Sequence, residues 1–111
     1  MALKLKDFYR GDAKRWRVVW PNDIAGAVIV FGMKKLLTQE VPDLQIVATL
    51  DAPDENGRVY GGFFEITATQ SRLLVPRTYF CDHEITLPTG EVGTFGAQQI
   101  NVLADVAKWG S

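Results

Sequence analysis

The sequence has only one cysteine and one histidine among its 111 residues. One cysteine excludes an internal disulfide bond, and the usual ligand sets of a zinc site cannot be assembled from these two residues. An excess of positive charge is also absent, because 12 Lys and Arg residues stand against 13 Asp and Glu residues. We therefore expect no metal and no cofactor. We also expect neither nucleic acid nor a membrane as partner, since no basic field exists to attract them.

Long apolar runs are missing too. The longest, over residues 24–33, is interrupted by Gly26 and Gly32 and reaches about half of the ~20 residues that a membrane-spanning helix needs. The first seven residues lack the continuous apolar stretch of a secretory signal. We therefore expect the chain to fold in a cytoplasm, where Cys81 stays reduced.

The length and composition are those of one globular domain. Domains of roughly 100–150 residues are the commonest. A content of 47% hydrophobic and 23% charged residues is ordinary for a folded chain. We expect a single domain over residues 1–106 and a tail over residues 107–111.

Apolar and polar residues alternate along most of the chain, which is the pattern of half-buried β-strands. Over residues 14–20, Trp16, Val18 and Trp20 fall on one face, and Arg15 and Arg17 fall on the other. Residues 27–33 are almost wholly apolar and predict a strand buried on both faces. Further strands are predicted at residues 3–9, 44–50, 59–67, 79–87, 92–95 and 99–103. In the strand over 59–67, the two adjacent glycines 61 and 62 indicate a bulge or a close backbone approach.

Helix is expected at two places only, as one turn over residues 34–40 and one over residues 68–74. About seven or eight strands with frequent turns predict an all-β, immunoglobulin-like antiparallel β-sandwich. Tyr79 stands two residues before Cys81 and fits the tyrosine corner of such sandwiches, in which the hydroxyl bonds backbone a few residues upstream. The predicted core contains Trp16, Val18, Trp20, Ile29, Phe31, Ile46, Tyr79, Ile85 and Val102.

Few residues offer catalytic chemistry. Cys81 and His83 share one strand face and could form a nucleophile and base pair. Both should point into the core, however, so a buried histidine held by a hydrogen bond is the favoured interpretation. Asp82 and Glu84 are paired carboxylates such as glycoside cleavage uses, but the polar face of a strand explains them more simply. We expect no enzyme activity.

Metal and receptor binding each have one candidate loop. Asp51, Asp54 and Glu55 could offer oxygen ligands to calcium, although their spacing lacks the alternation of a calcium-binding loop. The integrin-binding tripeptide formed by residues 10–12, Arg-Gly-Asp, stands where a turn between two strands is needed. Solvated loops and turns are the favoured interpretation of both.

Basic and aromatic residues are interleaved over residues 14–20, as on surfaces that bind single-stranded nucleic acid. Arg15 and Arg17 should point away from Trp16 and Trp20, so charge and stacking would not meet on one face. The tryptophans could instead line a sugar-binding face, but a core position is favoured for both.

The order of these segments resembles the immunoglobulin-like domain at the N-terminus of phage baseplate upper proteins. The resemblance covers residues 7–106, and Arg77 stands where that family has a glycine before the corner tyrosine. It rests on residues 7–12 and 16–20, 24–31, 57–59 and 66–67, 76–82, 89–92 and 100–106.

The resemblance implies a non-enzymatic structural protein of a tailed-phage particle, located in the virion, in its tail, baseplate or fibre attachment. Its partners would be other virion proteins or copies of itself. A carbohydrate- or host-receptor-binding β-sandwich is the alternative. Because open sandwiches leave strand edges unpaired, and because the tail is apolar, we expect contacts through the terminal segments, by Leu3, Leu5, Val106 and Trp109.

Overall fold

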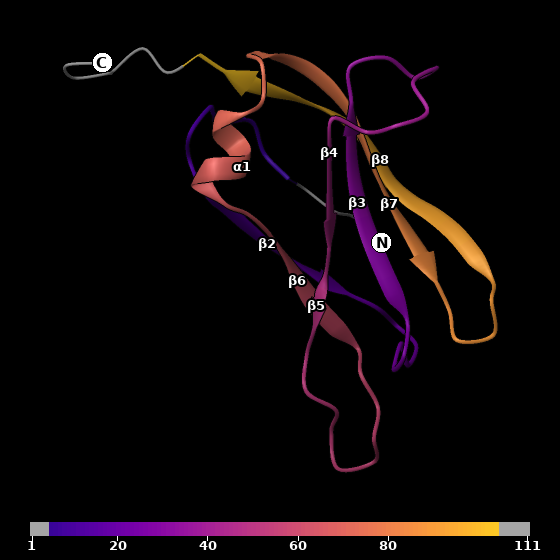
Figure 1. Ribbon diagram of the computed structural model, residues 1–111. Helices are drawn as coiled ribbons and strands as arrows, with labels where there is room; N and C mark the ends of the chain where they lie inside the picture. The colour runs from indigo at the N-terminus through magenta and orange to yellow at the C-terminus, as the bar shows by residue number, and fades with distance from the viewer. Residues whose placement is uncertain (1–4, 105–111) are drawn as a thin grey trace.

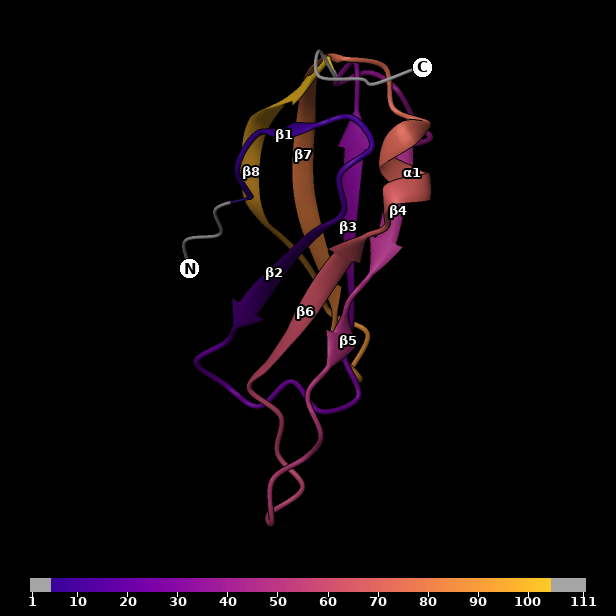
Figure 2. The same ribbon diagram turned by 90° about the vertical axis from the view of Figure 1, so that its left-hand side faces the viewer.

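The computed structural model describes residues 5–104, which fold into two β-sheets packed face to face (Figures 1 and 2). One sheet contains β1 (Phe8–Tyr9), β3 (Val28–Lys34), β4 (Leu44–Val47), β7 (Arg77–Thr86) and β8 (Val92–Leu103). The other contains β2 (Lys14–Val19), β5 (Thr49–Leu50) and β6 (Gly61–Ile66), and the helix α1 (Ala68–Arg72) leads from β6 to β7. The strand orders are β1-β8-β7-β3-β4 and β2-β6-β5. Neighbouring strands are antiparallel except β1 and β8, which are parallel.

The core lies between the sheets and is filled by alternate residues of the strands, as the period of two requires. Seven of the nine predicted core residues are buried, whereas Trp16 and Trp20 are partly buried against the core. The prediction of an all-β sandwich is confirmed. The buried apolar residues are Leu5, Phe8, Val18, Ile24, Ala27, Ile29, Phe31, Met33, Ile46, Val59, Phe64, Ile66, Leu74, Tyr79, Cys81, Ile85, Ile100 and Val102.

Residues 44–50 form two strands rather than the one predicted. β4 pairs with β3 in the larger sheet, and β5 pairs with β6 in the smaller sheet. Between them, the backbone amide of Ala48 still donates to the Ile29 carbonyl at 2.8 Å before the chain crosses to the other sheet. The alternating pattern continues through the crossing because the same side of the chain faces the core in both sheets.

Residues 92–103 form one strand, whereas two were predicted. Gly96 and Ala97 both lie opposite Asp82, because the register passes from Cys81 paired with Gln98 to His83 paired with Phe95. Gly96 has a φ of +65°, which a glycine adopts without strain and which is typical of a β-bulge. The bulge shifts the alternation of inward and outward residues, and this shift made the segment look like two strands.

Two further predictions need correction. β3 is buried on one face only, since Val28 on the other face is 49% exposed. The region after it forms no helix: the Gln39 side chain accepts from the Lys35 and Leu36 amides and so folds a turn. The predicted helix near Ala68 is present and begins with a capping box between Thr67 and Gln70.

Candidate functional site

The predicted terminal contact residues are placed only in part. Leu3, Val106 and Trp109 lie outside the described residues. Leu5 is 5% exposed and packs in the domain's own core, so it anchors the start of the chain and is not part of an exposed docking surface. The strand predicted over residues 3–9 is represented within the described residues by Phe8–Tyr9 alone.

Cys81 and His83 project from β7 into the space between the sheets, as predicted. The Cys81 thiol is 3.8 Å from the Tyr79 carbonyl oxygen. Burial raises the pKa of the Cys81 thiol to about 12. The thiol therefore stays protonated near neutral pH, which makes it a poor nucleophile. His83 is engaged elsewhere: its Nε2 accepts from the indole Nε1 of Trp16 at 3.4 Å. The geometry favours two core residues and not a catalytic pair.

His83 is fully buried and surrounded by aromatic rings. It stacks on Phe95 with 5.0 Å between ring centroids and meets Phe31 at 5.0 Å and Phe64 at 5.1 Å. Burial lowers its pKa to about 4, and the nearby Phe95 backbone and Asp82 carboxylate oppose this shift without cancelling it. His83 is therefore neutral near pH 7. Its bond to Trp16 joins β7 of one sheet to β2 of the other.

The carboxylates of the predicted calcium loop have other partners. Asp51 forms an ion pair with Arg17 at 2.6 Å, and this guanidinium lowers the pKa of the Asp51 carboxyl. Asp54 accepts from the backbone amides of Asn56 and Arg58, which closes the loop tip. Within residues 5–104, no group of three or more His, Cys, Asp or Glu side chains could hold a metal ion. The loop is shaped by its own polar contacts.

The Arg-Gly-Asp tripeptide forms the turn from β1 to β2. Gly11 has a φ of +94°, as expected of a glycine turn, and its amide donates to the Ser71 hydroxyl at 2.9 Å. The guanidinium Nε of Arg10 donates to the Arg72 carbonyl at the end of α1, also at 2.9 Å. The tripeptide thus fastens the turn to the helix.

The basic and aromatic residues of β2 lie on opposite faces, as predicted. Trp16 stacks on Phe64 between the sheets, with 5.3 Å between centroids. Arg15 lies outside, with its guanidinium 3.8 Å from the centre of the Phe63 ring. Trp20 meets the Phe95 ring edge-on at 4.4 Å. Both tryptophans are thus used in packing.

Large aliphatic side chains are exposed on the loop after β3 and on the loop before β7. Both loops lie at the end of the sandwich where β3 stops and β7 starts, at the top of Figure 1. A hydrogen bond joins the loops, from Arg77 Nη2 to the Lys35 carbonyl at 3.1 Å. Sequence reasoning missed this surface, although the paired leucines after Lys34 and Lys35 belonged to no predicted strand. We call it the apolar end; its members, each more than half exposed, are Leu36, Leu37, Val41, Leu73 and Val75.

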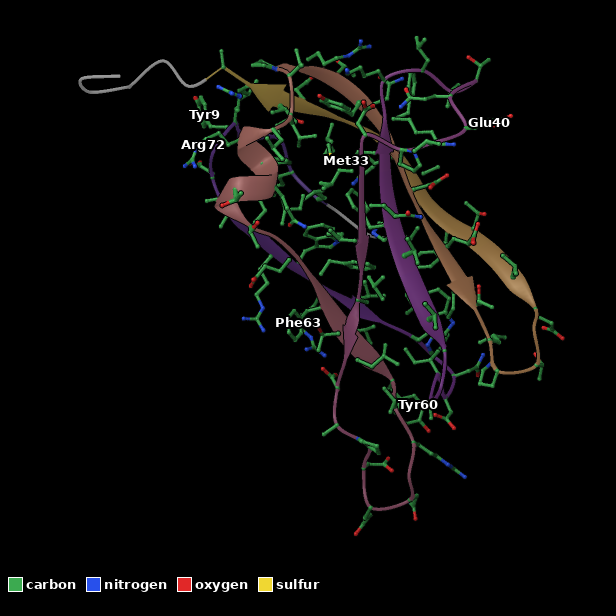
Figure 3. The ribbon with its side chains drawn as sticks, viewed as in Figure 1. Tyr9, Met33, Glu40, Tyr60, Phe63 and Arg72 are labelled. Carbon is green, nitrogen blue, oxygen red and sulfur yellow. The ribbon has the colours of Figure 1, made fainter. Side chains whose placement is uncertain are left out.

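A hollow of about 250 Å³ lies near the opposite end, beside Tyr60 (Figure 3). The Tyr60 ring is 39% exposed, and the Arg17–Asp51 pair forms part of the wall. Gly61 leaves room for that pair, because a Cβ there would lie 2.9 Å from Arg17 Nη2. The hollow combines one aromatic face with charged hydrogen-bonding groups.

Comparison with protein-family models, with curated proteins and with solved structures finds no match to this chain. Within the described residues, no helix has both the length and the apolar character needed to cross a bilayer.

Proposed function

We propose that the chain is a non-enzymatic, immunoglobulin-like module of a tailed-phage particle that acts through protein–protein contacts in the tail, baseplate or fibre attachment. The collinear motifs over residues 7–106 support the phage role. The strand order β1-β8-β7-β3-β4 against β2-β6-β5 supports the immunoglobulin-like assignment. So does the hydrogen bond from the Tyr79 hydroxyl to the Val75 carbonyl at 2.8 Å, which has the form of a tyrosine corner.

The apolar end carries the proposal. Leu73 is 81% exposed and Leu37 is 73% exposed, and both stand on loops that hydrogen bonds hold in place. Several exposed aliphatic side chains on two loops at one end of a fold are typical of surfaces that another protein covers. Arg72 and Arg77 lie beside them and remain exposed, so the surface fits a partner with an apolar centre and acidic groups around it.

The test is the protein content of phage particles produced by the host that carries this gene. We expect mass spectrometry to find the chain in purified particles. The double variant Leu37→Asp/Leu73→Asp should be lost from them, while Val47→Asp, which changes another residue that is more than half exposed, on the outer face of β4, should be retained. Absence of the wild-type chain from particles, or retention of the double variant, would contradict the proposal.

Binding of a carbohydrate on the host surface is the second candidate. It is favoured by the hollow beside Tyr60, where an aromatic ring stands next to the Arg17–Asp51 pair. Three tryptophans were first considered for this role. Trp16 and Trp20 are used in packing, and Trp109 lies outside the described residues. A glycan array probed with wild-type protein and Tyr60→Ala distinguishes the candidates, because glycan binding that disappears in Tyr60→Ala would favour this second function.

A further inference from the structure

The edges of the two sheets differ in how they are protected. Natural sheets protect an edge strand by making it short or by placing charged residues on it. β1 and β5 have two residues each and β4 has four. β2 is longer, with six residues, but carries Lys14, Arg15 and Arg17. These four edges are each short or charged.

β8 lies next to the short edge strand β1 and is less protected, because most of its length extends beyond β1. It pairs with β7 from Val92 to Val102, but with β1 only at Val102 and Leu103. Just below, the Asp7 carboxylate accepts from the Asn101 amide at 2.8 Å. In the described part of the chain, residues 92–97 have no strand beside them on the side away from β7. We call this stretch the open edge of β8.

The direction in which the backbone groups of the open edge point follows from the hairpin between β7 and β8. The Leu87 amide donates to the Glu91 carbonyl, and in an antiparallel ladder every second residue pair is hydrogen-bonded. The pairs Gly93 with Ile85 and Phe95 with His83 are therefore hydrogen-bonded as well. The residues between them, Val92 and Thr94, therefore direct both N–H and C=O away from β7. Unpaired backbone groups of this kind are a template for another strand.

The open edge also lacks the features that keep other strands away. Residues 92–103 contain no charged residue and no proline. Val92 is 59% exposed. The bulge at Gly96 bends β8, which limits regular pairing to the part of the open edge that precedes Gly96.

We propose that the open edge of β8 is the pairing site for a second copy of this chain, with the two β8 strands antiparallel about a twofold axis. Gly93 lies on the axis, where the two backbones approach most closely and side chains would crowd. Val92 of each copy pairs with Thr94 of the other, so all outward N–H and C=O groups of these residues are used. The larger sheets of the two copies become one continuous sheet.

Self-complementarity selects a second copy over an unrelated strand. In an antiparallel pair centred on Gly93, residues 92–94 of the two copies face one another and are uncharged, and Glu91 of each copy faces Phe95 of the other, so no like charges meet. A twofold contact uses the same surface on both copies and is closed, which leaves no further open edge. This inference goes beyond the proposed function, since the open edge is separate from the apolar end.

The test uses purified full-length protein. We expect sedimentation to show a dimer at high concentration, and hydrogen exchange at the Val92 and Thr94 amides to slow as concentration rises. Thr94→Pro removes one outward N–H without removing a bond to β7, and it should raise the dimer dissociation constant at least tenfold. The matched variant Thr94→Val keeps the N–H and should dimerise like wild type. Circular dichroism checks that both variants fold.

Three results would overturn the proposal. The first is a monomer at every concentration, with fast exchange at Val92 and Thr94. The second is a dimer that Thr94→Pro leaves unchanged, which would place the contact elsewhere. The third is slow exchange that does not depend on concentration, which would mean that the same chain covers the edge. Because particles are not involved, failure here leaves the test of the proposed function intact, and the reverse also holds.

Discussion

β7 and β8 are adjacent strands of similar length, with ten and twelve residues, but their surroundings differ. β7 has a hydrogen-bonded neighbour on each side, and its inward residues Tyr79, Cys81, His83 and Ile85 are all buried. Among residues 5–104, β8 has a full-length neighbour on one side only, and it contains a bulge. A strand with neighbours on both sides keeps a strict alternation of buried and exposed residues. A strand that lacks a neighbour along part of one side can interrupt that alternation with a bulge.

The comparison predicts that loss of volume is costly opposite β7 and cheap at the exposed start of β8. Phe31 pairs with His83, is fully buried and packs against Trp16 and Phe64. Phe31→Ala should lower the free energy of unfolding by about 3–5 kcal/mol, as measured by urea denaturation, because a cavity remains. Val92→Ala on β8 should change it by less than ~0.5 kcal/mol. Equal effects of the two variants would break the comparison.

His83 makes the interior of β7 sensitive to acid. Burial holds its folded-state pKa near 4, against 6.5 for an unperturbed histidine, so the unfolded chain takes up the proton first. Stability should therefore be constant above pH 6.5 and fall by about 3 kcal/mol between pH 6.5 and 4. A proton on Nε2 would also face the Trp16 N–H that this nitrogen now accepts.

The measurement is the free energy of unfolding in urea at several pH values between 7.5 and 4. His83→Phe should remove the decline in this window. The carboxyl groups of Asp23 and Asp51 have pKa values lowered from 3.8, so their contribution is lost only at more acid pH. A decline that persists in His83→Phe would assign the acid sensitivity to another group.

Two glycines sharpen the comparison between interior and edge. A Cβ on Gly62 of β6 would lie 2.6 Å from the Thr49 carbonyl oxygen and 3.1 Å from the Leu50 Cα. A Cβ on Gly93 of β8 would meet only Ile85 Cγ2, at 3.7 Å. Gly62→Ala should cost about 1–3 kcal/mol because backbone must move. Gly93→Ala should cost less than ~0.5 kcal/mol, measured by thermal unfolding at low protein concentration.

The sequence was informative where each residue has one environment. Alternation placed Val18, Ile46 and Tyr79 in the core, and of the two features that the paired glycines indicated, a bulge or a close backbone approach, the structure shows a close approach at Gly62. The sequence was misleading where two different arrangements of strands give the same alternation of apolar and polar residues. Residues 44–50 alternate without a break although they cross between sheets at Ala48, since both sheets share the core.

Surface features were harder to predict from the sequence. Leu36 and Leu37 are exposed on a loop that the Gln39 side chain folds, and this contact has no periodic signal in the sequence. The tripeptide containing Arg10 forms the turn that was predicted, but its hydrogen bond to the end of α1 has no signal in the sequence. The open edge of β8 depends on which strand lies next to it, and strand order cannot be obtained from alternation.

The hydrogen bond of the Tyr79 hydroxyl offers the smallest and most specific prediction. The Tyr79 ring is fully buried at the start of β7, and its hydroxyl donates to the Val75 carbonyl at 2.8 Å. Tyr79→Phe keeps the ring and removes this bond, so it should lower the free energy of unfolding by about 0.5–1.5 kcal/mol in urea denaturation. Tyr9→Phe is the matched control on β1, where the ring is 48% exposed, and it should leave the free energy unchanged. If the two variants were equally stable, the bond from the Tyr79 hydroxyl would contribute nothing, and the loop before β7 would be held by the buried Leu74 side chain and the remaining hydrogen bonds.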